Sequence, residues 1–225
     1  MYLSEDEART KLVEIGRVMY EQGYVVTNDG NLSIKLSEDT ILITPTGVCK
    51  GSMCEEDMVV MGLDGSVISR GALNPTSESK MHIRVYKENG CVRSVVHAHP
   101  VYATTYSILQ RPLDKPYLME AIMQLGVVPL APYAKQGTCE VADSIAPYAK
   151  DYASCLLSNH GALTWGSDID QAFSRMEVLE NYARITYLVD SLGGACGLTQ
   201  TQIDDLGHIM EDKGNPPLVL PKQLN

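Results

Sequence analysis

Several motifs that commonly identify a protein's function are missing from this 225-residue sequence. It contains no G-x-G-x-x-G segment and no P-loop, so the common nucleotide-binding motifs are excluded. No apolar run approaches the roughly 20 residues that span a bilayer, and the acidic residues 1–7 do not resemble a signal peptide. We therefore expect a cytoplasmic protein that does not associate with membranes.

Basic residues are also few. The chain has 18 lysines and arginines against 28 aspartates and glutamates, which gives a formal net charge of -10. This charge argues against nucleic acid or an anionic membrane surface as a partner. A phosphorylated substrate would have to be held locally, by backbone amides and hydroxyl groups.

Cysteine pairs at metal-binding or redox spacing are absent. The chain has no C-x-x-C, whereas zinc knuckles and disulfide frameworks need close or regular spacing. Cys155 lies within an apolar, strand-like run. We interpret all six cysteines as reduced structural thiols: Cys49, Cys54, Cys91, Cys139, Cys155 and Cys196.

The composition, with 44% hydrophobic residues and no linker-like stretch, predicts a single domain over residues 1–225. Residues 214–225 are expected to form an extended C-terminal tail. Apolar periodicity and end signals predict helices after Ser4, after residues 74–78, after Pro100 and from Asp168 to residue 192. Strands are predicted at 32–36, 40–44, 59–61, 67–68, 92–99 and 153–158. Hairpins mixed with helices indicate an α/β layered domain with a largely antiparallel sheet.

A pair of histidines is the strongest chemical signal in the chain. His97 and His99 are one residue apart on a predicted strand, so both imidazoles point to one face. A catalytic zinc site needs about three protein ligands, and His160, after the strand at 153–158, is the third candidate. Glu78, in a predicted first helical turn, could bind the metal or act as a base. Taken alone, it could equally be a carboxylate that favours the helix dipole.

The remaining polar signals are weaker. His82 and His208 are interpreted as hydrogen-bonded structural histidines, and residues 137–138 and Asp168 as helix caps. Residues 28–33 and 44–47 are each typical of turns, and residues 75–77 add further small and hydroxyl-bearing side chains. Together they supply hydroxyl groups and free amides, which could bind a phosphate.

The order of these motifs resembles the class II aldolase/adducin family over roughly residues 8–190. The resemblance is carried by residues 30–33 (Gly-Asn-Leu-Ser), 43–47 (Ile-Thr-Pro-Thr-Gly), 75–78 (Pro-Thr-Ser-Glu), 96–99 (Val-His-Ala-His), 131–138 (Ala-Pro-Tyr-Ala-x-x-Gly-Thr) and 159–161 (Asn-His-Gly). It implies a three-layer α/β/α sandwich around a mixed, mostly antiparallel sheet. It also implies a homotetramer with active sites between subunits.

The same resemblance assigns roles to individual residues. It implies Zn²⁺, or another divalent metal such as Mn²⁺ or Co²⁺, on His97, His99 and His160, with Glu78 as fourth ligand and acid/base. Tyr117 lies near the position of the family's proton-donating tyrosine, which comes from a neighbouring subunit. A second tyrosine, expected in the tail, has no counterpart because no tyrosine follows Tyr187. The family's phosphate-binding positions correspond to Asn31, Thr46, Gly47, Thr76 and Ser77.

The implied activity is the reversible cleavage of a ketose 1-phosphate, L-fuculose 1-phosphate first, to dihydroxyacetone phosphate and a short aldehyde such as L-lactaldehyde. Family aldolases for 5-deoxy- or 5-methylthio-ribulose 1-phosphate, and family dehydratases and decarboxylases, share the histidines and stay open. A ribulose-5-phosphate 4-epimerase is less favoured, because that subgroup has Asp where Glu78 stands. An adducin-like scaffold is disfavoured because such chains lose the histidines.

Overall fold

The computed structural model describes residues 2–214 and 216–224, and its centre is one twisted sheet. Across the described residues the sheet has eight strands in the order β4-β3-β2-β1-β5-β8-β7-β6. Neighbouring strands are antiparallel except for the parallel pair β6 and β7. The strands are β1 (Asn31–Lys35), β2 (Thr40–Ile43), β3 (Val59–Gly62), β4 (Val67–Ser69), β5 (Ser94–Ala98), β6 (Leu130–Ala131), β7 (Ser154–Leu157) and β8 (Gly161–Gly166). The predicted mixed, mostly antiparallel sheet is confirmed.

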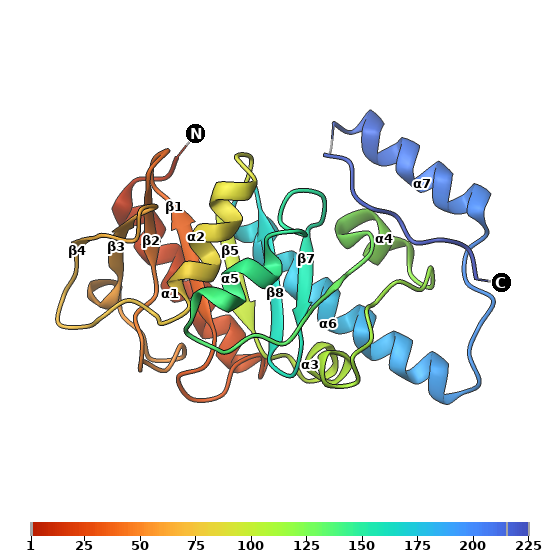
Figure 1. Ribbon diagram of the computed structural model, residues 1–225, viewed down its shortest axis with the longest axis horizontal. Coiled ribbons are helices and arrows are strands. Elements are labelled where there is room, and N and C mark those ends of the chain that lie inside the picture. Colours follow the sequence, from red (N-terminus) through yellow and green to blue (C-terminus); the bar gives the residue numbers. More distant parts are fainter. Residues whose placement is uncertain (1, 215, 225) are drawn as a thin grey trace.

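Helices cover both faces of this sheet (Figure 1). On one face, α2 (Ser79–Glu88) packs against α5 (Cys139–Ile145) and encloses an apolar cluster that includes Trp165 and Tyr86. On the other face, α1 (Glu5–Glu21), α3 (Val101–Ile108) and α6 (Ile169–Ser191) enclose a second cluster around Leu12 and Met176. The predicted three-layer α/β/α sandwich is therefore confirmed.

Local signals in the sequence explain where several elements begin. The Ser4 hydroxyl accepts from the Glu7 amide while the Glu7 carboxylate accepts from the Ser4 amide, so α1 opens with a capping box. The Asp168 side chain accepts from the Gln171 amide and caps α6, and Thr138 caps α5 in the same way. Both predicted caps are confirmed.

Strand β8 was not predicted, although it forms the middle of the sheet's second half. All six of its residues are buried, so the sequence has no apolar/polar alternation to indicate a strand. The strand pairs with β5 on one side and β7 on the other. It thereby places the turn that carries His160 beside the strand that carries His97.

The C-terminal part lies beyond the sheet (Figure 1). Helix α7 (Gln200–Asp212), which was also not predicted, packs on α4 (Met119–Leu125) through Ile203 and Ile122. Residues 216–224 carry no helix or strand, and the Val127 amide donates to the Val219 carbonyl at 2.7 Å. Two positions of the expected tail, 215 and 225, lie outside the described residues. In the part of the chain that is described, no helix has the length and apolar character to cross a membrane.

The cysteine interpretation needs a correction. Cys155 is buried in β7, as a structural thiol should be, and burial raises its pKa to about 12. Four other cysteines have exposed side chains, so they do not contribute to the core: Cys54, Cys91, Cys139 and Cys196. All six thiols are free in the described structure.

Candidate functional site

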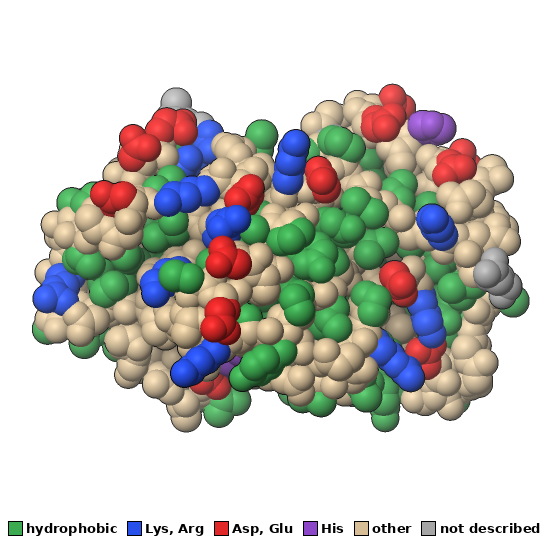
Figure 2. All heavy atoms as spheres, viewed as in Figure 1, with side chains coloured by type: hydrophobic (Ala, Val, Ile, Leu, Met, Phe, Trp, Pro, Cys, Tyr) green, Lys and Arg blue, Asp and Glu red, His purple; other side chains and the backbone are tan. Residues whose placement is uncertain are grey.

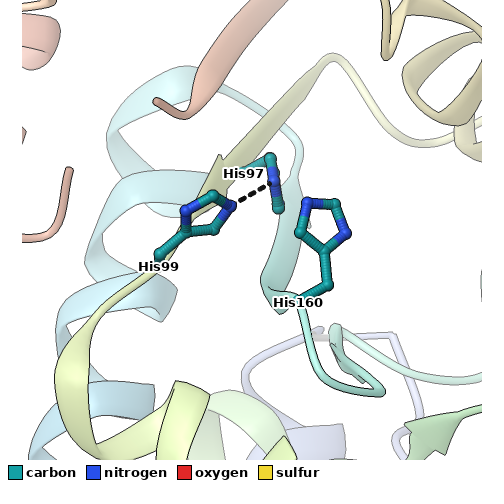
Figure 3. A group of neighbouring side chains, drawn as sticks. All are labelled: His97, His99 and His160. Atoms are coloured by element: carbon teal, nitrogen blue, oxygen red, sulfur yellow. Dashed lines mark hydrogen bonds between the residues drawn. The ribbon is translucent and has the colours of Figure 1, made fainter. Parts of the chain in front are cut away.

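Three imidazoles converge at one end of β5 (Figure 3). His97 lies within β5, His99 follows its last residue, and His160 lies in the turn between β7 and β8. The ring centroids are 4.7 to 5.1 Å apart, and the Nε2 atoms of His97 and His99 are 3.1 Å apart. Candidate ligand atoms of the three side chains all lie within 4.8 Å of one another. The structure therefore brings together the three histidines that the sequence singled out.

Gly161 makes this convergence possible. It is the first residue of β8, and Ala162 next to it pairs with Ala98 of β5. A Cβ atom at position 161 would lie 2.5 Å from His99 Cδ2 and 2.6 Å from the Ala98 carbonyl oxygen. The bare backbone at this position is what lets the two strands and the imidazoles approach closely.

Glu78 closes the inner side of the cluster. Its carboxylate is buried, with Oε2 3.2 Å from His97 Nε2 and Oε1 3.3 Å from His160 Nε2. Helix α2 begins one residue later than the sequence suggested, so Glu78 is its N-cap and not part of its first turn. Its own side chain makes no capping hydrogen bond, which leaves the carboxylate directed at the imidazoles.

This donor set fits a divalent metal. Within the described structure, Glu78 Oε1 and His160 Nε2 are buried and have no hydrogen-bond partner. A zinc ion with bonds of about 2.0–2.1 Å to tetrahedral ligands separates those ligands by roughly 3.4 Å. The observed separations of 3.1, 3.2 and 3.3 Å are close to that value. The orphaned polar atoms and the spacing therefore make this a candidate metal site.

The electrostatics of the site favour the neutral form of His99 and His160. Burial, together with the charge of the neighbouring His97, lowers the pKa of both His99 and His160 to about 4. Burial also opposes charge on His97, but the adjacent Glu78 carboxylate outweighs it and raises the His97 pKa. Burial raises the pKa of Glu78, but His97, His160 and Asn31 outweigh this effect, so that pKa is lowered. At neutral pH the site thus offers an ionised Glu78 carboxylate and the lone pairs of the neutral His99 and His160 imidazoles.

Neighbouring groups fix the tautomer of two of the imidazoles through contacts with their Nδ1 atoms. His97 Nδ1 lies 2.9 Å from the Ala162 carbonyl oxygen, which makes it a donor and leaves Nε2 free for a metal. His99 Nδ1 lies 3.6 Å from Asp29 Oδ2, an electrostatic contact that favours the same tautomer.

His82 is structural, as predicted, but it also connects to the site. The Asn31 amide donates to Glu78 Oε2 at 2.8 Å, and Asn31 Oδ1 lies 2.6 Å from His82 Nε2. The oxygen can only accept, so His82 Nε2 donates and Nδ1 accepts from the Ser33 hydroxyl at 2.7 Å. Because the Ser33 hydroxyl proton is already donated to His82, Ser33 Oγ can only accept from Tyr86, whose hydroxyl oxygen lies 2.7 Å away. This buried chain fixes which side of the Asn31 amide faces the carboxylate.

A polar cavity of about 170 Å³ adjoins the imidazoles. Three chain segments that are distant in sequence, residues 28–31, 45–47 and 76–78, form most of its walls, and His99 and Gln136 complete them. All five residues at the predicted phosphate positions line it: Asn31, Thr46, Gly47, Thr76 and Ser77. Sequence reasoning missed Gln136 as a further lining residue, although it lies inside the 131–138 motif.

Two predicted residues lie elsewhere. Tyr117 is not among the residues lining this cavity, and its hydroxyl lies 3.4 Å from Asp190 Oδ1 of α6. His208 is exposed on α7, so its interpretation as a hydrogen-bonded structural histidine was wrong. The helical face that carries it is turned to solvent.

Comparison with known proteins agrees with this geometry. The family described as Class II Aldolase and Adducin N-terminal domain matches residues 10–187. The chain belongs to the class II aldolase and adducin family. The resemblance inferred from the motifs is thereby confirmed.

Relatives within the class II aldolase and adducin family carry two kinds of name. An L-fuculose phosphate aldolase of Methanococcus maripaludis is 35% identical over 180 residues, 80% of this chain and 96% of that protein. A 3-oxo-tetronate 4-phosphate decarboxylase of Pectobacterium atrosepticum is 33% identical over 191 residues, 83% and 86% of the two chains. A solved L-fuculose 1-phosphate aldolase superposes with a TM-score of 0.85 at 30% identity, covering 93% of this chain and 98% of that one. These similarities leave the substrate open.

Proposed function

We propose that the protein is a zinc-dependent aldolase that reversibly cleaves L-fuculose 1-phosphate to dihydroxyacetone phosphate and L-lactaldehyde. The observation that carries the proposal is the position of the buried Glu78 carboxylate. It contacts two imidazoles of the candidate metal centre and also lines the polar cavity. A proton-transfer group therefore stands between a metal site and a cavity suited to a phosphorylated substrate.

The donor set of His97, His99, His160 and Glu78 would hold the metal. When bound, Zn²⁺ acts as a Lewis acid toward a carbonyl oxygen and stabilises the negative charge that develops as a neighbouring carbon–carbon bond breaks. Glu78 would carry the proton to or from the reacting carbon of dihydroxyacetone phosphate. The Asn31 amide, held by His82, keeps that carboxylate in place.

The cavity supplies free donors for the phosphate. In the described part of the chain, the amides of Gly47 and Ser77 and the hydroxyl of Thr46 have no hydrogen-bond partner, and all three residues line the cavity. The Thr76 hydroxyl accepts from the Glu78 amide at 3.3 Å and so couples the cavity wall to the carboxylate. Several convergent amides and hydroxyls form the type of anion site expected in an acidic protein.

A decarboxylase is the second candidate, because a decarboxylase relative is nearly as similar as the aldolase relatives. Loss of the carboxyl group of 3-oxo-tetronate 4-phosphate as CO₂ leaves the carbon skeleton of dihydroxyacetone phosphate. Both reactions therefore produce the same three-carbon phosphate through the same type of carbanion. The second product distinguishes them: an aldehyde in one case and CO₂ in the other.

The deciding experiment incubates the zinc-loaded protein with a panel of substrates. The panel contains L-fuculose 1-phosphate, 5-deoxy- and 5-methylthio-ribulose 1-phosphates, ribulose 5-phosphate and 3-oxo-tetronate 4-phosphate. A coupled reductase detects dihydroxyacetone phosphate, and separate assays detect CO₂ and epimerised pentose phosphate. We expect dihydroxyacetone phosphate and aldehyde from L-fuculose 1-phosphate. Turnover confined to CO₂ release or to epimerisation would overturn the aldolase assignment.

We further propose a cytoplasmic homotetramer in which each site lies between two subunits and Tyr117 of a neighbouring subunit protonates the departing aldehyde oxygen. Exposed apolar side chains next to the site support such an assembly. Val101 directly follows the segment that carries His99 and is 65% exposed, and Tyr133 in the 131–138 motif is 73% exposed.

A further inference from the structure

Lys50 is a buried lysine behind the polar cavity. It follows the turn that carries Thr46 and Gly47, and only 1% of its surface is exposed. Its Nζ donates to the Val48 carbonyl at 2.9 Å and to the Asn28 carbonyl at 3.4 Å. Both acceptors are neutral, and among the described residues no carboxylate lies within 4.0 Å of this amine.

Such a lysine is unusual, because a buried charge is costly unless it has a partner of opposite charge. Burial lowers the pKa of Lys50 to about 8. The neighbouring Cys49 and Asp29 raise this pKa, but their effects are weaker than that of burial. The amine thus remains mostly protonated at neutral pH. Because no carboxylate is in contact with this amine, its charge remains available to an anion that arrives with a ligand.

The two acceptor carbonyls identify where that ligand lies. Asn28 belongs to one segment lining the cavity, and Val48 directly follows Gly47 of the second lining segment. Lys50 therefore joins two walls of the cavity from behind. The cavity lining itself contains no lysine or arginine.

On the face that Figure 2 displays, lysine and arginine side chains are scattered among acidic ones and form no basic patch. The carboxylates of Asp29 and Glu78 also line the cavity, and the formal net charge of the chain is -10, so a nearby positive charge would favour a phosphate group there.

We propose that Lys50 is the buried counter-charge of the phosphate subsite and that it positions the two loops that bind the phosphate. The proposal rests on the proposed function for the identity of the cavity, but its test requires no turnover. Lys50 holds the loops that carry Asn28 and Val48 in place, and its positive charge attracts the phosphate electrostatically. The free amides and hydroxyls of the cavity make the direct contacts with the phosphate.

Sulfate is the suitable probe, because it remains a dianion across the pH range in which a lysine titrates. Calorimetry would measure sulfate binding to zinc-loaded wild type, Lys50→Met, Lys50→Arg and Lys150→Met. Lys150 is exposed, so its variant controls for loss of one positive charge. At an effective dielectric constant of about 20, one unit charge within about 10 Å of a dianion is enough to account for at least a tenfold change in affinity.

We expect Lys50→Met to bind sulfate at least about tenfold more weakly at pH 7, with unchanged zinc content, while Lys150→Met resembles wild type. Wild-type affinity should fall as the pH rises from 7 to 10 and approach that of Lys50→Met, because the amine loses its charge. Lys50→Arg should keep its affinity across this range, since arginine stays charged. If the substrate panel gives turnover, Lys50→Met should raise KM more than it lowers kcat.

Equal sulfate affinity in wild type and Lys50→Met, or a difference that does not change with pH, would overturn the proposal and leave Lys50 a structural tether. Should Lys50→Met fail to fold, the pH profiles of wild type and Lys50→Arg decide the question. Lys50-dependent sulfate binding without turnover on any substrate would refute the aldolase assignment and leave the anion subsite intact.

Discussion

Replacing Gly161 with alanine tests whether the three imidazoles function as one metal site. The added methyl group would lie 2.5 Å from His99 Cδ2, whereas carbon atoms in good contact are about 3.5–4.0 Å apart. The His99 ring must therefore move by about 1 Å. Ligand positions in a metal site are held to about 0.2 Å, so this displacement exceeds what the site tolerates.

The backbone limits any compensating movement. The same methyl group would lie 2.6 Å from the Ala98 carbonyl oxygen, so β5 and β8 would have to separate at the pair Ala98 and Ala162. Overpacking of this kind costs about 1–3 kcal/mol of folding stability. We expect zinc affinity to fall by about 10- to 100-fold, the range typical of disturbed ligand orientation. This corresponds to about 1.4–2.8 kcal/mol of binding free energy.

Zinc affinity would be measured by competition with a chromophoric chelator, and stability by urea unfolding of the metal-free protein. Gly90→Ala is the matched control, because a Cβ atom there would meet nothing within 4 Å and the residue is exposed. Gly90→Ala should leave the zinc affinity unchanged. Wild-type zinc affinity in Gly161→Ala would refute the reasoning, since the histidines could then not depend on the bare backbone at position 161.

Three further predictions concern the site. Glu78→Gln should retain zinc on the three histidines but lower turnover about 10²- to 10⁴-fold, and near wild-type turnover would contradict the acid/base role. His99→Ala should lose zinc, which elemental analysis after dialysis would show, and a full complement would contradict the ligand assignment. Burial lowers the His82 pKa to about 3, against about 6.5 in the unfolded chain. As the pH falls below 6.5, the unfolded chain binds a proton on His82 before the folded protein does. The free energy of unfolding therefore decreases by about 1 kcal/mol per pH unit between pH 6.5 and pH 3. Urea unfolding of the metal-free protein should show this slope between pH 6 and 4, and His82→Gln should reduce it.

The sequence predicted those parts of the site that depend on local geometry. His97 and His99 share a strand face because side chains alternate along a strand, and this holds wherever the strand lies in the sheet. The caps at Ser4 and Asp168 likewise involve residues only three positions apart. His160 was the third candidate because it follows a predicted strand, and the family motifs then assigned it to the same metal as the other two histidines.

Other parts of the site depend on strand order, which the sequence did not reveal. Strand β8 is buried on both faces and lacks alternation, so its pairing with β5 could not be inferred. Lys50 carries no motif, and only the fold shows that its amine is enclosed between two loops. A lysine after a turn would ordinarily be exposed.

The direction of the buried hydrogen-bond chain has a consequence for Glu78. If the carboxylate is ionised, Asn31 must present its amide group to it, and His82 must then donate to Asn31 Oδ1. A protonated His82 would donate from both nitrogens, and Ser33 would have to reverse its hydroxyl. The Nε2 donor is present in either protonation state, so His82 keeps the Asn31 amide directed at Glu78, and the low pKa of His82 preserves the bond from the Ser33 hydroxyl to Nδ1 above pH 3. A histidine that contacts neither the candidate metal centre nor the cavity thus determines the hydrogen bonding of the group proposed to move the proton.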